Sequence, residues 1–169
     1  MAHDIAIGCN GCTACARQCP TNAIRGTPRG HHVIDPDLCI DCGVCGAICP
    51  VAAVRDDLGR LVPRVSREAR LRPAVDTDAC NGCALCIDVC PFGCRAVVGP
   101  RYLGAAYLAA PLRCVACGEC GRLCLKGAIE MRPMDLRAYD PEAEVERLEQ
   151  LLTGPTPGAE ARRRPARGT

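Results

Sequence analysis

Short alternations of apolar and polar residues, separated by Gly and Pro, mark the start of the chain. Residues 3–7 alternate enough to predict a short strand, and residues 22–25 and 31–35 predict two paired strands around a turn at 26–30. Between them, residues 14–19 predict a single helical turn, which ends because the next residue is a proline. The pattern therefore indicates very short elements joined by loops.

The middle of the chain continues this pattern and adds a charged connection. Residues 52–55 and 60–65 predict a hairpin across 56–59. Residues 66–74 are rich in arginine, and we interpret them as a solvated linker, with a docking patch for a partner or an anionic ligand as the alternative. Residues 102–108 predict a strand or hairpin over the interior, with an apolar surface facing a partner as the alternative.

A longer helix is predicted only near the C-terminus. Asp140 is its expected cap, Pro141 takes the first helical position, acidic residues follow in the first turn, and Gly154 ends the helix. The helix packs either on its own body or on another subunit. Residues 155–169 carry arginines among Pro, Gly and Ala, and they predict a disordered basic tail. The apolar stripe of the helix comprises Val145, Leu148, Leu151 and Leu152.

Cysteine spacing is the strongest signal in the sequence. The phrase C-x2-C-x2-C-x3-C occurs four times, and this is the run that holds a [4Fe–4S] cluster in proteins. Its two-residue gaps make a tight loop whose three sulfurs converge on three corners of one small cube, while the fourth cysteine begins a separate turn. The runs, numbered 1 to 4 in chain order, are Cys9, Cys12, Cys15 and Cys19; Cys39, Cys42, Cys45 and Cys49; Cys80, Cys83, Cys86 and Cys90; and Cys114, Cys117, Cys120 and Cys124.

Zinc and disulfides are the competing interpretations of these cysteines. Four ligands fill a tetrahedral zinc site and leave no role for a regular third cysteine. Disulfides suit small secreted chains, but no secretory signal precedes Cys9, and the total of 17 cysteines is odd. The spacing therefore favours iron and sulfide.

Two cysteines depart from the regular pattern. Cys94 lies outside the runs and is interpreted as a buried free thiol; replacement of a ligand, or a hydrogen bond to a cluster, are the alternatives. Cys124 is followed by Leu125, whereas the fourth cysteine of each other run is followed by proline. Because its spacing survives, Cys124 is kept as a ligand.

Composition and charge narrow the class of protein further. Aromatic residues make up 2% of the chain, so the interior must consist of clusters and aliphatic side chains, and metal binding supplies much of the folding free energy. The formal net charge of +2 counts cysteines as neutral. Each oxidised cubane with its four thiolates contributes about −2, which makes the holoprotein acidic, at about −6. With few stacking aromatics and an acidic body, we expect no nucleic-acid partner.

The sequence also indicates a compartment and a domain organisation. No run of 18 apolar residues predicts a membrane span, and reduced cysteine chemistry favours a cytoplasmic location. The first cysteines of successive runs lie 30, 41 and 34 residues apart, a spacing of two paired units. The predicted domains are two two-cluster units at 1–65 and 75–134, a linker at 66–74, a C-terminal helix within 135–154 and the tail at 155–169.

On these residues, both units resemble the two-cluster bacterial ferredoxin, and residues 3–133 resemble a tandem four-cluster ferredoxin, or polyferredoxin. The resemblance implies an α+β fold with two βαβ-like halves in each unit. It also implies that the fourth cysteines are exchanged between the two runs of a unit. The implied ligand sets are Cys9, Cys12, Cys15 and Cys49; Cys39, Cys42, Cys45 and Cys19; Cys80, Cys83, Cys86 and Cys124; and Cys114, Cys117, Cys120 and Cys90.

The resemblance implies single-electron transfer through four [4Fe–4S] clusters and no catalysis, because complete cysteine ligation leaves no iron open to substrate. The chain looks most like the small iron–sulfur subunit of bacterial tungsten-dependent aldehyde oxidoreductases. The expected partners are a catalytic oxidoreductase subunit and a second redox partner, a flavoprotein or a ferredoxin, and the layout also allows end-to-end self-association. The alternatives are a free-standing, low-potential ferredoxin that diffuses between partners, and a structural or regulatory protein whose arginine tail binds an anionic polymer.

Overall fold

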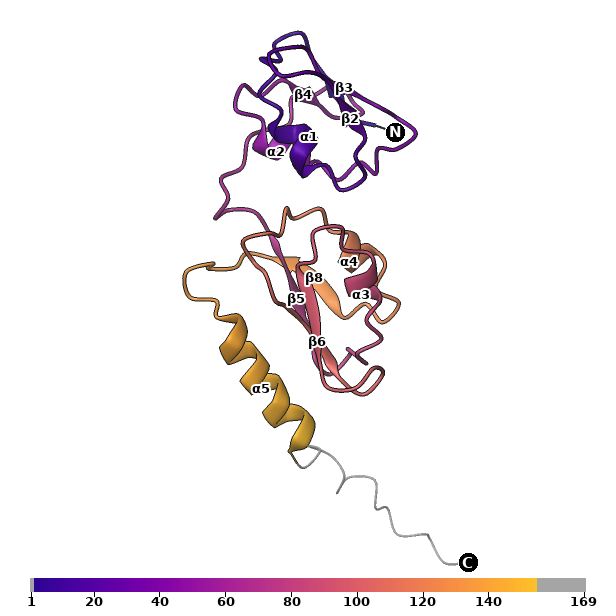
Figure 1. Cartoon of the computed structure of the whole chain (residues 1–169), viewed down its shortest axis with the longest axis vertical. Coiled ribbons are helices and arrows are strands. Elements are labelled where there is room, and N and C mark those ends of the chain that lie inside the picture. Colours follow the sequence, from indigo (N-terminus) through magenta and orange to yellow (C-terminus); the bar gives the residue numbers. More distant parts are fainter. Residues whose placement is uncertain (1, 155–169) are drawn as a thin grey trace, which may run out of the picture.

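The computed structural model describes residues 2–154, and the two halves of this range repeat one strand arrangement. In each half the first strand pairs with the last, and the two middle strands pair with each other, all antiparallel. Figure 1 shows the two halves following one another along the long axis of the molecule. Unit 1 contains β1 (Asp4–Ile5), β2 (Ile24–Arg25), β3 (Val33–Ile34) and β4 (Val54–Arg55), and unit 2 contains β5 (Arg72–Val75), β6 (Arg95–Val98), β7 (Ala105–Leu108) and β8 (Ile129–Arg132).

One short helix accompanies each cysteine run and begins one residue before its third cysteine. Within each unit the two helices lie against each other, which brings the two runs of that unit together. In unit 1 both helices end at the fourth cysteine, which adopts an extended backbone before the proline. The mixture of short helices and strands agrees with the expected α+β class. The helices are α1 (Ala14–Gln18), α2 (Val44–Ile48), α3 (Leu85–Asp88) and α4 (Glu119–Arg122).

The segment after β4 differs from the predicted hairpin. Residues 60–65 form no strand, but a single bridge joins Arg55 to Leu61, on the edge of β4 that does not pair with β1. The turn itself is as expected: the Asp56 carboxylate accepts hydrogen bonds from the N–H groups of Leu58 and Arg60, at 3.0 and 2.9 Å. The last three residues of the expected connection, 72–74, belong to strand β5.

The C-terminal helix α5 (Pro141–Thr153) packs on its own chain. Asp140 caps it, because its Oδ1 accepts a hydrogen bond from the N–H of Glu142 at 2.9 Å. Leu148 is fully buried in a small core with Val98 and Ala105 of unit 2. The end of the apolar stripe is more open, with Leu151 49% exposed.

The remaining predictions for this end of the chain concern the tail and the membrane. The predicted tail at 155–169 lies outside the described residues. Within residues 2–154, every helix is too short or too polar to cross a bilayer.

Apolar contacts join the two units. Val115 of unit 2 belongs to the same buried cluster as Ile5 and Val54 of unit 1 and is only 6% exposed. Phe92 and Cys117, also from unit 2, pack against this cluster. The core of unit 1 therefore continues into unit 2, and it meets run 4 there.

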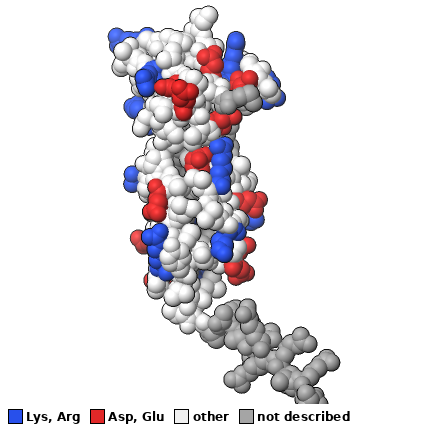
Figure 2. Space-filling view, turned by 90° about the vertical axis from the view of Figure 1, so that its right-hand side faces the viewer, with Lys and Arg blue, Asp and Glu red and all other residues white. Residues whose placement is uncertain are grey.

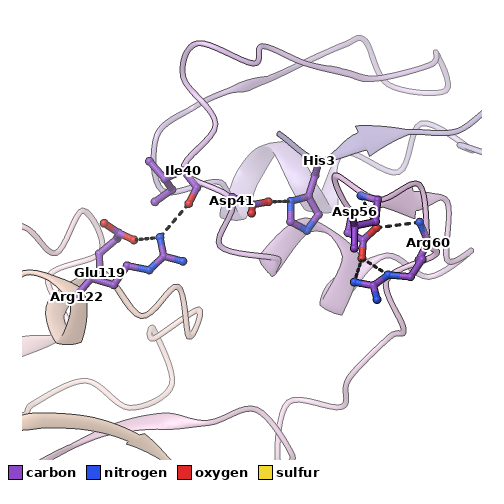
Figure 3. A network of polar contacts seen from close by, with 8 residues as sticks. His3, Ile40, Asp41, Asp56, Arg60, Glu119 and Arg122 are labelled. Atoms are coloured by element: carbon purple, nitrogen blue, oxygen red, sulfur yellow. Dashed lines mark hydrogen bonds and ion pairs between the residues drawn. The ribbon is translucent and has the colours of Figure 1, made fainter. Parts of the chain in front are cut away.

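Polar contacts fix the loops near this junction (Figure 3). Arg122 of α4 donates from Nη1 to the carbonyl of Ile40 in run 2 and to the Glu119 carboxylate, both at 3.0 Å. On the other side of run 2, Nδ1 of the buried His3 lies 2.6 Å from Oδ1 of Asp41. Exposed ion pairs contribute little to stability, so we interpret the Arg122 contact with Ile40 as fixing the position of run 2 against unit 2.

Candidate iron–sulfur centres

The four cysteine loops share one unusual backbone conformation. The second and fourth residues after each first cysteine have positive φ, as does the third residue after each fourth cysteine. Alternating turns of this kind point successive N–H groups into one concavity, an arrangement that binds anions and occurs at iron–sulfur sites. The twelve residues are Gly11, Thr13, Asn22, Asp41, Gly43, Ala52, Gly82, Ala84, Gly93, Ala116, Gly118 and Gly127, with φ between 49° and 81°.

Backbone N–H groups donate directly to cysteine sulfurs. In three runs the sulfur of the fourth cysteine accepts from the residue four positions later: Ala23 to Cys19 and Ala53 to Cys49, both at 3.3 Å, and Cys94 to Cys90 at 3.4 Å. Such bonds favour the negative thiolate over the neutral thiol and are a means by which a protein sets a cluster potential. The loops therefore provide the hydrogen bonds that an anionic cluster requires.

Burial makes these thiols unsuited to carry charge unless a cation is bound. It raises the pKa of Cys45 to about 12, and the adjacent thiolates of Cys42, Cys39 and Cys15 also raise it. It raises the pKa of Cys120 in unit 2 to about 11. Metal ligands must be deprotonated, so these groups lose their protons when a metal binds. The donor set thus fits a metal that binds thiolates, with assembly of the site coupled to proton release.

Two cavities bring cysteines of different runs together. In each cavity the first three cysteines of one run meet the fourth cysteine of the preceding run. The resemblance implies the same grouping for two of the four ligand sets, and their assignment stays a prediction. The cysteines that line the cavity in unit 1 are Cys19, Cys39, Cys42 and Cys45, and those that line the cavity in unit 2 are Cys90, Cys94, Cys114, Cys117 and Cys120.

For the other two implied sets, the structure indicates only that the first three cysteines of run 1 and of run 3 lie near one another. Burial raises the pKa of Cys15, and its neighbours Cys12 and Cys9 raise it further, so run 1 is gathered at one place. Burial also raises the pKa of Cys86, which lies near the first two cysteines of run 3. The assignment of the fourth cysteine to each of the four sets stays a prediction.

The cysteines are spaced more widely than around a single ion. Within residues 2–154, no group of three Cys, His, Asp or Glu side chains is close enough to hold one metal ion. A tetrahedral zinc with bonds of about 2.3 Å would place its sulfurs about 3.8 Å apart. A cube of four irons, each bound to one cysteine, requires a wider set.

Cys94 occupies a position that alanine occupies in the other runs. Four residues after the fourth cysteine stand Ala23, Ala53 and Ala128, all buried. Cys94 is 1% exposed, and burial together with the adjacent Cys90 and Cys114 raises its pKa to about 12. Cys94 follows Cys90 by four residues, and this spacing in the sequence could have indicated that the two lie side by side. That Cys94 is a free thiol stays a prediction.

The close approach of the backbone at Gly11 gives a testable consequence. A Cβ at Gly11, where φ is +69°, would lie 2.5 Å from the backbone of Arg29, whereas a Cβ at Gly118 would meet nothing within 4 Å. We expect Gly11→Ala to lower the thermal midpoint of cluster loss clearly more than Gly118→Ala. The control change carries only the backbone strain, about 1–2 kcal/mol. Visible absorption measures the thermal midpoint of cluster loss. Equal midpoints in Gly11→Ala and Gly118→Ala would contradict this packing.

Comparisons with known proteins agree with the cysteine geometry. Two models of the 4Fe-4S dicluster domain match residues 8–53 and 31–91. A "Ferredoxin 7Fe" from Hydrogenibacillus schlegelii is 43% identical over 56 residues, which are 32% of this chain and 70% of the relative. An ion-translocating oxidoreductase complex subunit from Methanosarcina acetivorans is 46% identical over 48 residues, which are 28% of this chain and 18% of that relative.

A solved structure also matches at low similarity. It is a formate dehydrogenase–heterodisulfide reductase–formylmethanofuran dehydrogenase complex from Methanospirillum hungatei, with 17% identity and a TM-score of 0.39, and the match covers 86% of this chain and 56% of that one.

The repeated loops, the N–H···S bonds and the dicluster matches define an iron–sulfur protein for electron transfer, with four [4Fe–4S] clusters. This protein belongs to the ferredoxin family.

Proposed function

We propose that the chain is an electron-relay subunit that connects a catalytic oxidoreductase subunit to a second redox partner. The observation that carries this proposal is the approach of Cys42 to Cys117. These residues belong to different units, yet they line one cavity of about 660 Å³, and each is the second cysteine of its run. Two separate dicluster units thereby become one row.

The ligand sets that we propose are the four implied by the family resemblance. The two cavities that contain Cys19 with run 2 and Cys90 with run 4 support the exchange. The route then leads from run 1 through run 2 to Cys42, across the junction to Cys117, and through run 4 to run 3. When bound, each [4Fe–4S] cluster accepts and gives one electron at a time. The chain's own residues fix the spacing of the row.

The two ends of this row are the places where partners would dock. In the proposed route run 1 and run 3 are the first and last members, and Cys12 of run 1 is exposed. On the face shown in Figure 2, basic and acidic side chains are interspersed, so that face offers no broad single-sign patch for a partner. We propose a catalytic subunit at one end, of which a tungsten-dependent aldehyde oxidoreductase is the particular candidate, and a flavoprotein or ferredoxin at the other, in the cytoplasm. A second copy of this chain is the further candidate for an end-to-end contact.

A diffusing carrier is the second candidate function, and the packing of α5 favours it. The helix buries Leu148 on unit 2, and a helix that covers its own chain is not reserved for another subunit. Such a ferredoxin would use the same four clusters and would dock only briefly with each partner.

Anaerobic affinity purification from the source cells distinguishes these functions. The relay subunit is expected to retain a larger subunit, and metal analysis is expected to find tungsten or molybdenum beside iron. A monomer with iron as its only metal would contradict the relay subunit and support the carrier.

A further inference from the structure

Unit 2 contains a buried arginine whose charge is not balanced by a carboxylate within residues 2–154. Arg95, the first residue of β6, is 4% exposed. Its Nη1 donates to the carbonyl of Pro73 at 3.3 Å, but Nε and Nη2 are buried and have no hydrogen-bond partner among residues 2–154. Burying an unpaired guanidinium is strongly unfavourable, so an anion is expected beside it.

The groups that face Arg95 are cysteines of both runs of unit 2. Arg95 begins β6, which packs against α3, the helix that contains Cys86. It also lines the cavity that contains Cys90 and the first three cysteines of run 4. The one carboxylate lining that cavity, Glu119, already pairs with Arg122. Arg95 therefore lies between the two cysteine groups of unit 2.

Unit 1 has no such charge at the corresponding position. The fifth residue after the fourth cysteine is Ile24 in run 1, Val54 in run 2 and Ile129 in run 4, whereas it is Arg95 in run 3. Ile24 and Val54 are buried, at 8% and 1% exposure. The two units thus share a backbone plan, but at this position only unit 2 carries a buried positive charge.

We propose that Arg95 raises the reduction potentials of the two clusters of unit 2 above those of unit 1, so that electrons collect in unit 2. A fixed positive charge stabilises the added electron, and it does so strongly in a site with a low dielectric constant. The row of clusters then has a direction, downhill from unit 1 to unit 2. This inference rests on the ligand sets proposed above. Arg95 acts only through its charge on the cluster potentials and binds no substrate.

Potentiometric titration of the isolated holoprotein, followed by electron paramagnetic resonance, tests this inference. Arg95→Met is expected to lower the potentials of two of the four clusters while iron content stays constant. The equilibrium between the units should shift about tenfold toward unit 1, which corresponds to about 59 mV for a one-electron couple. Arg95→Lys keeps the charge and should stay close to the wild type. Unchanged potentials in Arg95→Met would overturn the proposal.

A matched control and a second measurement complete the test. Arg101 donates to the carbonyl of Cys83 at 3.1 Å but its side chain is 60% exposed, so water screens its charge, and Arg101→Met should leave all four potentials unchanged. If Arg95→Met loses iron, the test is the titration of the wild-type protein, which gives the reduction potentials of its four clusters. Two clusters reduced ahead of the other two support the proposal, and four clusters with one common potential overturn it. Because no partner is present, this result is independent of whether the chain is a relay subunit or a carrier.

Discussion

Removal of iron is expected to unfold most of residues 2–154. The strands are two to four residues long and the helices beside the cysteines four or five, far below what is stable without support. With 2% aromatic residues, the chain cannot replace the clusters by an ordinary core. Most of the folding free energy must therefore come from metal binding.

Far-ultraviolet circular dichroism during anaerobic chelation measures this directly. We expect the spectrum to change to that of a largely disordered chain, in step with the loss of visible absorption. Reconstitution with iron and sulfide should restore both signals together, which controls for irreversible damage. A spectrum that stays native-like after complete iron removal would show that side-chain packing alone maintains the fold.

Loss of a cysteine at the junction is expected to interrupt electron transfer between the units. Cys117→Ala should cost one cluster, about four irons per chain. Because Cys117 and Cys42 line one cavity between the units, the gap that an electron must cross becomes much longer, and tunnelling falls steeply with distance. The rate of transfer from donor to acceptor in a coupled assay should fall to background. The partner enzyme should keep its activity with an artificial acceptor.

Two further variants locate the effect. Cys12→Ala removes a ligand at the far end of unit 1 and should also break transfer through the whole row. Cys94→Ala, which changes a cysteine outside the runs, should keep the full iron content and the coupled rate. An unchanged coupled rate in Cys117→Ala would reject a route through the junction.

The sequence predicted those features that depend on local chemistry. Cysteine spacing indicated four similar loops, and the structure gives them the same positive-φ positions. Proline after Cys19 predicted where α1 ends, and Asp140 with Pro141 predicted the start of α5. In each case a neighbouring residue restricts the backbone, so distant contacts are not needed.

Features that depend on long-range contacts could not be predicted in this way. Strands of two residues have no measurable period, so the pairing of β1 with β4 could not be distinguished from a hairpin over 60–65. The packing of α5 on unit 2 depends on Leu148 meeting Val98, which the stripe alone left open. Arg95 is one of many arginines in the sequence, and its burial became visible only with unit 2 folded around it.

Iron analysis of anaerobically purified protein tests the central claim most directly. Four coordinatively closed clusters require about sixteen irons and as many sulfides per chain. The account predicts that stoichiometry, with zinc near zero. A preparation that holds far fewer irons, or zinc in their place, would contradict it.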